Sequence, residues 1–508
     1  MAQPADVDIL VIGGGVNGAG IARDAAGRGF SVALCEQGDL AGATSSASSK
    51  LIHGGLRYLE YYDFRLVHEA LAEREALLAA APHIIWPTRF ILPYEKGVRP
   101  AWMIRLGLLL YDWLGPRKRL PGSKRIKLSG SLEGAPLNKN LTTGFSYFDC
   151  SVDDSRLVAL NALDARERGA EIRTRTRCLS ARRELGLWRV ALQDAREGTE
   201  TTLTARALVN AAGPWAQDVL NRVCRLKTGK ELRLVKGSHI IAPRLYAGDH
   251  AYILQNADRR VVFVMPHGEE FSLIGTTEQP FAGDPSSVAI SPDEIAYLCD
   301  AVSHFFQSPL RPKDVIGSFS GVRPLYDDKA ANASAVTRDY VLDLDAPEGA
   351  APLLSVLGGK ITTYRRMAER AVGMLAAHLE PARPKPWTRT APLPGGDMEG
   401  ADFDLFLRQF HTKHAWLPLA QARRLARAYG TRAERILGKA RAPEDLGLDF
   451  GAGLYQAEID YLMDQEWALT GEDVLWRRSK LGLRLSPSES ARVCAYVSAR
   501  SHDRGAQT

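Results

Sequence analysis

The segment 8–36 constrains the fold of this chain more than any other part of it. It runs through an apolar strand, three glycines in G-x-G-x-x-G spacing, a helix, a second apolar strand and an acid: Asp8–Ile12, Gly13, Gly15 and Gly18, Ala19–Gly29, Phe30–Cys35 and Glu36. This order is typical of a βαβ unit that binds a dinucleotide at the edge of a parallel sheet. We therefore expect a buried parallel sheet and a nucleotide cofactor.

Each residue of the motif has a physical reason. Gly13 permits the tight turn, Gly15 lets the backbone approach a pyrophosphate, and Gly18 lets the helix pack closely on the sheet. The helix N-terminus supplies N–H groups and partial positive charge for the phosphates. Glu36 is placed to accept hydrogen bonds from a ribose diol.

Three later segments favour FAD over an exchangeable nicotinamide. Thr44–Lys50 is a hydroxyl-rich loop, Ala207–Trp215 is an apolar strand ending at a Gly-Pro turn, and Ser355–Lys360 is a strand that enters glycines. A helix expected near Ile361 is suited to hold the charge of a reduced flavin. A cofactor held by segments so far apart is extended and permanently bound. The expected contacts are Gly13, Gly15, Asn17, Gly18, Glu36, Thr44, Ser45, Ser46, Ser48, Ser49, Lys50, Ala212, Gly213, Gly358, Gly359, Ile361 and Thr362.

The rest of the chain predicts two further parts. Short β patterns such as 239–242, 252–254, 260–265 and 271–275 predict a mainly antiparallel sheet inserted over the cofactor. A proline-rich stretch, 381–396, precedes a helical C-terminal part. The predicted domains are 1–390, with cofactor segments at 1–80, 150–225 and 330–380 and substrate segments at 81–149 and 226–329, and a helical domain at 391–508.

Composition excludes several classes of protein. The six cysteines are scattered without Cys-x-x-Cys spacing, so we expect no metal site and no redox dithiol. No leader peptide and no stretch of 18 uncharged apolar residues is seen, so no membrane-spanning helix is expected. The apolar run 102–114 followed by the basic run 117–127 fits an interfacial membrane helix and, equally well, a buried core helix beside a solvated loop. Nothing accompanies the basic run that would predict nucleic-acid binding.

The chain resembles the aerobic FAD-dependent glycerol-3-phosphate dehydrogenases over nearly its whole length. The resemblance is carried by IGGGVNGAG (12–20), ATSSASSKLIHGGLRYLE (43–60), RLVHEALAERE (65–75), RPAWMIRLGLLLYD (99–112), NAAGPWA (210–216), KGSHI (236–240), IGTTE (274–278), SGVRPL (320–325) and GGKITTYR (358–365). It implies an α/β fold: a Rossmann-like FAD-binding domain of the glutathione-reductase and D-amino-acid-oxidase type, an inserted antiparallel β substrate domain and a C-terminal α-helical domain. It also implies oxidation of sn-glycerol 3-phosphate to dihydroxyacetone phosphate, a membrane quinone as acceptor, and peripheral attachment to an anionic surface, the inner face of the cytoplasmic membrane.

The same resemblance places three cations near the substrate. Arg57 and Arg323 lie in motifs expected beside it, and Lys360 follows the glycines near the flavin. Guanidinium and ammonium groups suit a phosphate dianion and can polarise the reacting oxygen. Arg323 and Lys360 are therefore expected to take part in catalysis, and Arg57 in substrate binding.

His53 is the first candidate for the general base, because imidazole accepts a proton near neutral pH. His239 is the second candidate and, with Tyr58 and Thr276, an expected substrate neighbour. Arg323 could instead stabilise an alkoxide without a dedicated base.

Three other functions remain open from the sequence. A soluble glycerol-3-phosphate oxidase would differ only in using O2, an FAD-dependent amine or amino-acid oxidase would need a carboxylate site, and a scaffold protein would keep flavin as filler. The C-terminal helices are expected to cap the catalytic body and are a candidate contact in a homodimer.

Overall fold

The motif that opens the chain forms the centre of a parallel sheet. The computed structural model describes residues 5–95, 99–116, 119–226, 230–258, 260–327 and 339–505. Strand β1 (Val7–Ile12) leads through the glycines into α1 (Val16–Gly27) and then into β2 (Val32–Cys35), which pairs with β1 in parallel. The predicted βαβ unit is confirmed, and its helix begins three residues earlier than the predicted Ala19.

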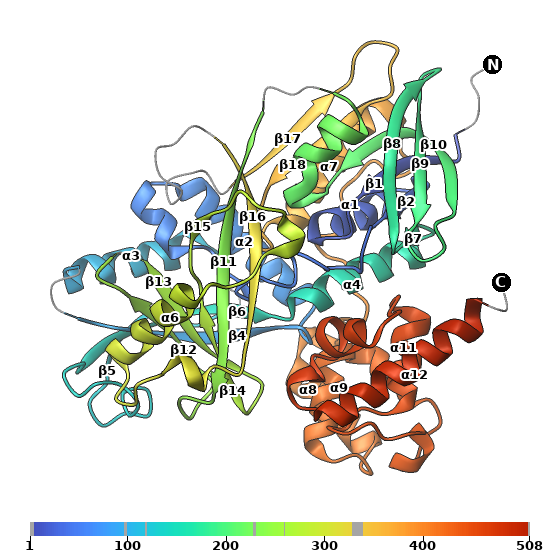
Figure 1. Cartoon of the computed structure of the whole chain (residues 1–508). Coiled ribbons are helices and arrows are strands. Elements are labelled where there is room, and N and C mark those ends of the chain that lie inside the picture. The colour runs from blue at the N-terminus through green and yellow to red at the C-terminus, as the bar shows by residue number, and fades with distance from the viewer. Residues whose placement is uncertain are drawn as a thin grey trace.

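This first sheet has the strand order β17-β18-β10-β1-β2-β7, and β9 and β8 extend it from β10 (Figure 1). The strands from β18 to β7 run parallel, while β17 and the β8–β9 hairpin are antiparallel additions. Helices α4 and α7 pack against α1. The bounds are β7 (Glu171–Arg173), β8 (Thr176–Glu184), β9 (Leu187–Asp194), β10 (Glu200–Asn210), β17 (Tyr340–Asp345), β18 (Leu353–Gly358), α4 (Asp154–Glu167) and α7 (Tyr364–Leu379).

The second sheet has the strand order β15-β11-β14-β13-β12-β4-β6-β3, with β16 on β11 and β5 on β6. All its pairs are antiparallel except β4 with β12, as the predicted insertion requires. Its strands are β3 (Leu51–Ile52), β4 (Ile85–Pro93), β5 (Lys124–Lys127), β6 (Thr143–Val152), β11 (Leu232–Pro243), β12 (Ala251–Gln255), β13 (Val261–His267), β14 (Phe271–Gly275), β15 (Gln279–Pro280) and β16 (Gly317–Tyr326). Helices α2 (Phe64–Ala80), α3 (Ala101–Leu114) and α6 (Pro292–Phe305) accompany it.

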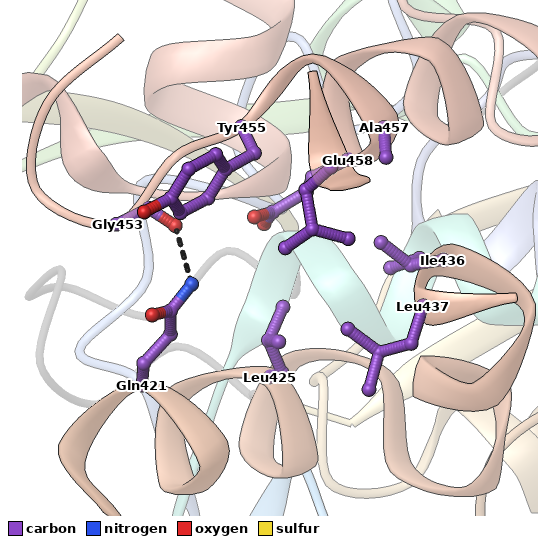
Figure 2. Close-up of a pocket in the computed structure, with 9 residues that line it drawn as sticks. Gln421, Leu425, Ile436, Leu437, Gly453, Tyr455, Ala457 and Glu458 are labelled. Carbon is purple, nitrogen blue, oxygen red and sulfur yellow. Dashed lines mark hydrogen bonds between the residues drawn. The ribbon is translucent and has the colours of Figure 1, made fainter. Parts of the chain in front are cut away.

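The C-terminal helices form a separate body with its own core, drawn in orange and red in Figure 1. They are α8 (Phe403–Lys413), α9 (Leu419–Tyr429), α10 (Ala433–Leu437), α11 (Gln456–Gln465) and α12 (Pro487–Gly505). A cavity between them has room for roughly one water molecule. Its polar side chains are already engaged, since Gln421 donates to the carbonyl of Gly453 at 3.4 Å (Figure 2) and Glu458 accepts from Arg424 at 2.7 Å. We assign it no ligand.

The proline-rich stretch 381–396 is fixed to the body of the protein. Trp387 Nε1 donates to the carbonyl of Asp24 at 3.1 Å, and Arg23 donates to the carbonyls of Ala391 and Pro392 at 3.2 Å. The connection therefore sets the position of the C-terminal helices instead of acting as a free tether.

Candidate active site

The glycine turn after β1 has the shape that a pyrophosphate requires. Gly13 has φ +113°, and a Cβ there would lie 2.5 Å from the carbonyl oxygen of Ala211. A Cβ on Gly18 would lie 1.9 Å from the carbonyl oxygen of Gly13, so only glycine lets α1 approach the turn this closely. Gly15 is the N-cap of α1 and has no side chain to cover the helix end. The positive end of α1 therefore faces the turn as predicted.

Glu36, at the end of β2, is held by backbone amides. Its carboxylate accepts from the N–H groups of Gly14 and Gly38, both at 2.7 Å. Burial raises the pKa of Glu36, and the two N–H bonds oppose that effect. The carboxylate is fixed beside the glycine turn, where a ribose diol is expected.

The segment 36–53, here called the lining segment, crosses from the glycine turn to the second sheet. Its contacts are Val16 N–H with Ser45 Oγ (3.0 Å), Thr44 Oγ1 with the Val322 carbonyl (2.7 Å), Ser49 Oγ with His239 Nε2 (2.9 Å) and His53 N–H with Thr362 Oγ1 (3.2 Å). One stretch of chain thus joins the predicted phosphate site to both predicted histidines.

Two predicted cofactor contacts within the lining segment have their side chains engaged elsewhere. Ser48 Oγ donates to Asp154 at 2.8 Å, and Lys50 Nζ donates to the same carboxylate at 2.8 Å and to the carbonyl of Ser46 at 2.9 Å. In this structure these side chains hold the segment in place, and their direct contact with FAD stays a prediction.

The glycines after β18 meet the N-terminal motif. Gly358 and Gly359 have φ values of +81° and +105°, and Asn17 Nδ2 donates to the carbonyl of Gly358 at 3.3 Å. The following helix, α7, starts at Tyr364 and not at the expected Ile361 because Ile361–Thr363 form a turn before it. Residues near both ends of the predicted cofactor region, Asn17 and Gly358, are therefore in contact. Directly after β10, the predicted Ala212 and Gly213 follow Ala211, whose N–H donates to the carbonyl of Ile12 at 2.9 Å.

The candidate substrate cations lie next to candidate hydrogen-bonding side chains. Arg323 Nη2, on β16, donates to Thr276 Oγ1 at 3.1 Å. A Cβ on Gly237 would lie 2.6 Å from Arg323 Nη2, so the absent side chain makes room for the guanidinium. Lys360 Nζ lies 3.7 Å from the ring centroid of Tyr58. The backbone of Arg57 belongs to the 3-10 helix Leu56–Tyr61, and its side chain lies outside the described residues.

His239 is buried with its ring fixed. It stacks on Phe319 with ring centroids 4.9 Å apart, and its Nε2 is hydrogen-bonded to Ser49. Burial, followed by the charges of Arg323 and Lys50, lowers the pKa of His239 to about 3. Such a ring stays neutral near pH 7 and is a weak proton acceptor, which disfavours His239 as the base. His53 as the base stays a prediction.

A buried polar relay behind His53 was not predicted from the sequence. Gly54 N–H donates to Tyr111 Oη at 2.8 Å, and Tyr111 donates to Asp149 at 2.8 Å. Asp149 also accepts from Arg74 at 2.6 Å. This relay ties the inner face of α3 to the loop that carries His53. No local pattern signals it, because its members lie on different elements.

Comparison with known proteins gives a consistent assignment. Residues 8–365 match the family model described as FAD dependent oxidoreductase, and residues 386–499 match the C-terminal domain of alpha-glycerophosphate oxidase. The chain is 55% identical over 493 residues to a glycerol-3-phosphate dehydrogenase of Pseudomonas aeruginosa, covering 96% of this chain and 94% of the relative. It is 52% identical over 491 residues to a D-erythritol 1-phosphate dehydrogenase of Brucella abortus, covering 97% of each.

The fold agrees with an X-ray structure of a glycerol-3-phosphate dehydrogenase from Bacillus halodurans complexed with FAD. The TM-score is 0.76 at 28% identity, over 98% of this chain and 95% of that chain. With the glycine turn, Glu36 and the lining segment, this makes FAD the cofactor. The chain belongs to the FAD-dependent oxidoreductases and, among them, to the glycerol-3-phosphate dehydrogenase family.

Proposed function

We propose that the chain oxidises sn-glycerol 3-phosphate to dihydroxyacetone phosphate, with hydride transfer from C2 to N5 of FAD and delivery of the electrons to a membrane quinone. The observation that carries the proposal is the placement of Arg323 beside Thr276 and of Lys360 beside Tyr58, next to the elements that form the cofactor site. Two cations with neighbouring hydroxyl groups suit a phosphorylated polyol. The name of the Pseudomonas aeruginosa relative supports the same substrate.

The roles follow from the chemistry of each group. Arg57 binds the phosphate, and Arg323 and Lys360 bind the phosphate and polarise the reacting oxygen. Tyr58 and Thr276 donate or accept hydrogen bonds around the carbon chain. His239, which is buried, acts from behind the site by holding Ser49 of the lining segment. His53 accepts the hydroxyl proton as C2 is oxidised. Bound FAD supplies the hydride acceptor.

Anaerobic mixing tests the substrate. We expect the flavin absorbance to bleach with glycerol 3-phosphate, and to bleach much more slowly with D-erythritol 1-phosphate, the substrate named for the Brucella abortus relative. Amino acids test the amine-oxidase alternative. Faster bleaching by the erythritol ester or by an amino acid would contradict the proposal.

The proposed quinone acceptor is supported by one exposed helix. Along α3, Trp102, Leu106, Leu109 and Trp113 form an apolar stripe at helical spacing, and the side chains of Trp102 and Trp113 are 66% and 79% exposed. The opposite face, with Leu108 and Tyr111, is buried. An apolar stripe on an otherwise anchored helix fits attachment in the plane of a membrane surface.

The two charges that interrupt α3 hold a basic segment against it. Arg105 Nη1 and Asp112 both bond to Ser123, Arg105 at 2.8 Å and Asp112 at 2.6 Å. Lys124 and Arg125 on β5 follow directly and are exposed. Cations beside an apolar stripe suit anionic lipid headgroups. Within the described residues, no helix has the length and apolar character needed to cross a membrane.

The electron acceptor is tested separately from the substrate. Re-oxidation of the bleached flavin is measured with a quinone in anionic vesicles and with air. We expect re-oxidation by quinone to be much faster than re-oxidation by air, and we expect air to produce little hydrogen peroxide. Stoichiometric peroxide and no response to quinone would identify the soluble oxidase instead.

A further inference from the structure

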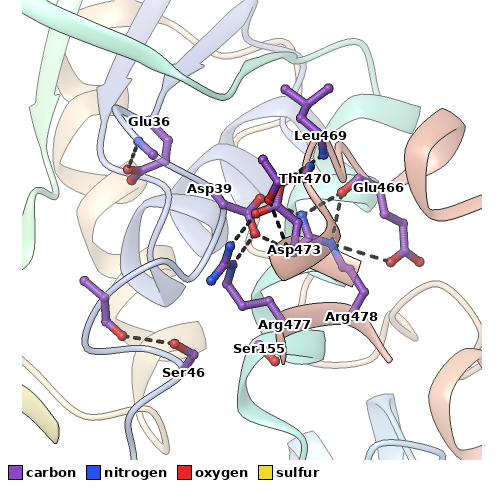
Figure 3. A network of polar contacts seen from close by, with 12 residues as sticks. Glu36, Asp39, Ser46, Ser155, Glu466, Leu469, Thr470, Asp473, Arg477 and Arg478 are labelled. Atoms are coloured by element: carbon purple, nitrogen blue, oxygen red, sulfur yellow. Dashed lines mark hydrogen bonds and ion pairs between the residues drawn. The ribbon is translucent and has the colours of Figure 1, made fainter. Parts of the chain in front are cut away.

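Buried charges join the C-terminal helical region to the lining segment of the FAD site. The group consists of Asp39, Lys50 and Asp154 on the FAD-binding side and Arg477, Arg478 and Lys480 on the C-terminal side, and is here called the interdomain charge cluster. Figure 3 shows the part of this cluster around Asp39, which Arg477 and Arg478 reach from the segment between α11 and α12. Charged side chains are rarely buried without partners of opposite charge. The contact between the C-terminal helical region and the lining segment is therefore specific.

The first anchor holds the turn after Glu36. Arg478 donates to the two oxygens of Asp39 at 2.8 and 2.9 Å, and Arg477 Nε donates to it at 2.6 Å. The side chain of Asp39 is 2% exposed. The same turn packs on the glycine motif, since Ala41 N–H donates to the carbonyl of Gly14 at 3.0 Å. Arg477 and Arg478 therefore fix the part of the lining segment that carries the predicted ribose acid.

The second anchor holds the other end of the lining segment. Lys480 Nζ donates to Asp154 at 2.9 Å, and Lys50 Nζ donates to the same carboxylate at 2.8 Å. Asp154 is fully buried, and Ser48 also donates to it. The two ammonium groups and the carboxylate form a single unit, so removing Lys480 leaves the buried charge of Asp154 with one cation fewer to compensate it.

We propose that Arg478 and Lys480 are positioning residues for FAD, so that tight cofactor binding depends on docking of the C-terminal helical region. Arg478 holds one end of the lining segment directly through Asp39, and Lys480 holds the other end through Asp154. Coupling of this kind is reciprocal: if docking orders the segment for FAD, bound FAD must strengthen docking by the same factor. The inference rests on the FAD site and not on the identity of the substrate.

The test compares FAD affinity in Arg478→Gln and Lys480→Gln with that of the wild type. FAD is removed and its rebinding is followed by the change in flavin fluorescence. We expect FAD affinity to fall about tenfold or more in each variant. Arg478→Gln removes the bidentate partner of Asp39, and Lys480→Gln removes one of the two cations that compensate Asp154, the carboxylate to which Lys50 and Ser48 are bonded. The rate of flavin reduction per bound FAD should stay within about twofold of the wild type, since neither residue reaches the reacting atoms. Lys480→Arg keeps the charge and should restore most of the affinity.

Arg424→Gln is the matched control. Arg424 makes a buried ion pair with Glu458 at 2.7 Å within the C-terminal helical region. Its loss should lower the melting temperature without weakening FAD binding. The proposal is wrong if Arg478→Gln and Lys480→Gln bind FAD as tightly as the wild type, or if folded Arg424→Gln loses FAD affinity to the same extent.

A measurement on the unmodified protein covers the case in which the variants do not fold. Hydrogen exchange is compared between the FAD-free and FAD-bound wild type. We expect FAD to slow amide exchange in 466–480 as well as in 36–50. Unchanged exchange in 466–480 would overturn the proposal. No substrate is present in this experiment, so its result stands whether or not glycerol 3-phosphate is oxidised.

Discussion

His53 belongs to the lining segment and His239 contacts that segment through Ser49, but the two histidines have different surroundings. His239 has its ring stacked, buried and bonded to Ser49, whereas His53 is half-buried on a loop between β3 and the 3-10 helix. A buried ring with a pKa of about 3 stays uncharged between pH 5 and 9. Any ionisation seen in kcat/KM between pH 5 and 9 should therefore come from a group other than His239.

His53→Gln tests the base directly. General-base catalysis contributes about 100-fold or more, so flavin reduction by the substrate should slow by that factor. The variant should keep its FAD spectrum, because the bond from the His53 backbone N–H to Thr362 does not depend on the side chain. Stopped-flow absorbance across pH 6–9 is the measurement. Wild-type rates over that range would refute the assignment and favour stabilisation of an alkoxide by Arg323.

Arg323→Gln tests the phosphate anchor. Loss of a charge-assisted contact should raise KM for glycerol 3-phosphate by about 10- to 100-fold. Glycerol has no phosphate, so its much weaker turnover should fall by less, through the lost polarisation of the reacting oxygen alone. The informative quantity is kcat/KM for glycerol 3-phosphate divided by kcat/KM for glycerol, and this ratio should fall. An unchanged ratio would show that Arg323 does not contact the phosphate.

At the scale of elements, α3 makes the clearest prediction. Trp102→Ser with Trp113→Ser removes the two most exposed aromatic rings of the apolar stripe while leaving its buried face intact. We expect binding to anionic vesicles to weaken about tenfold or more, with flavin reduction by substrate unchanged. Flotation with lipid measures the binding. Leu185→Asn, at an 89% exposed position in the β8–β9 turn, is the control and should bind as the wild type does.

Element identity could be predicted where the signal is local. The apolar runs of β1 and β10 and the glycines between β1 and α1 carry their own periodicity and turn chemistry, so the βαβ unit was predictable. The first and last residues of the elements were less predictable. Helix α1 includes Gly18, which a local rule assigns to the loop, because close packing against Gly13 outweighs the low helix propensity of glycine.

For the whole molecule, the interdomain charge cluster predicts a response to acid. Burial alone would raise the pKa of Asp154, but Lys480 and Lys50 outweigh it and lower that pKa to about 2, from 3.8. The resulting stability, about 2 kcal/mol, is fully present above pH 4 and is lost as the pH falls toward 2.

Asp154→Asn should therefore melt at a lower temperature than the wild type at pH 7. The difference between the two proteins should shrink as the pH is lowered from 4 to 2, because the wild-type carboxyl becomes protonated. Calorimetry of the FAD-bound proteins over this range is the measurement. A difference that does not change with pH would contradict a charged Asp154.

The contacts that unite the whole molecule could not be predicted from the sequence. Arg323 and Lys360 stand in recognisable motifs, whereas Arg478 and Asp39 are ordinary surface residue types whose burial arises only when distant segments meet. The same is true of Tyr111 and Asp149. Periodicity describes one element at a time and contains no information on which elements will face each other.

The relay from Tyr111 to Gly54 gives α3 two surfaces with different tolerance to engineering. Its outer row can be exchanged for residues that attach the enzyme to an electrode or a polymer in place of a membrane, because the side chains of that row point to solvent. Its inner row must keep both sequence and register, since a shift by one residue would withdraw the phenol from the loop of His53. A redesigned α3 should therefore preserve flavin reduction by substrate only if its outer row is changed and its inner row is left as it is.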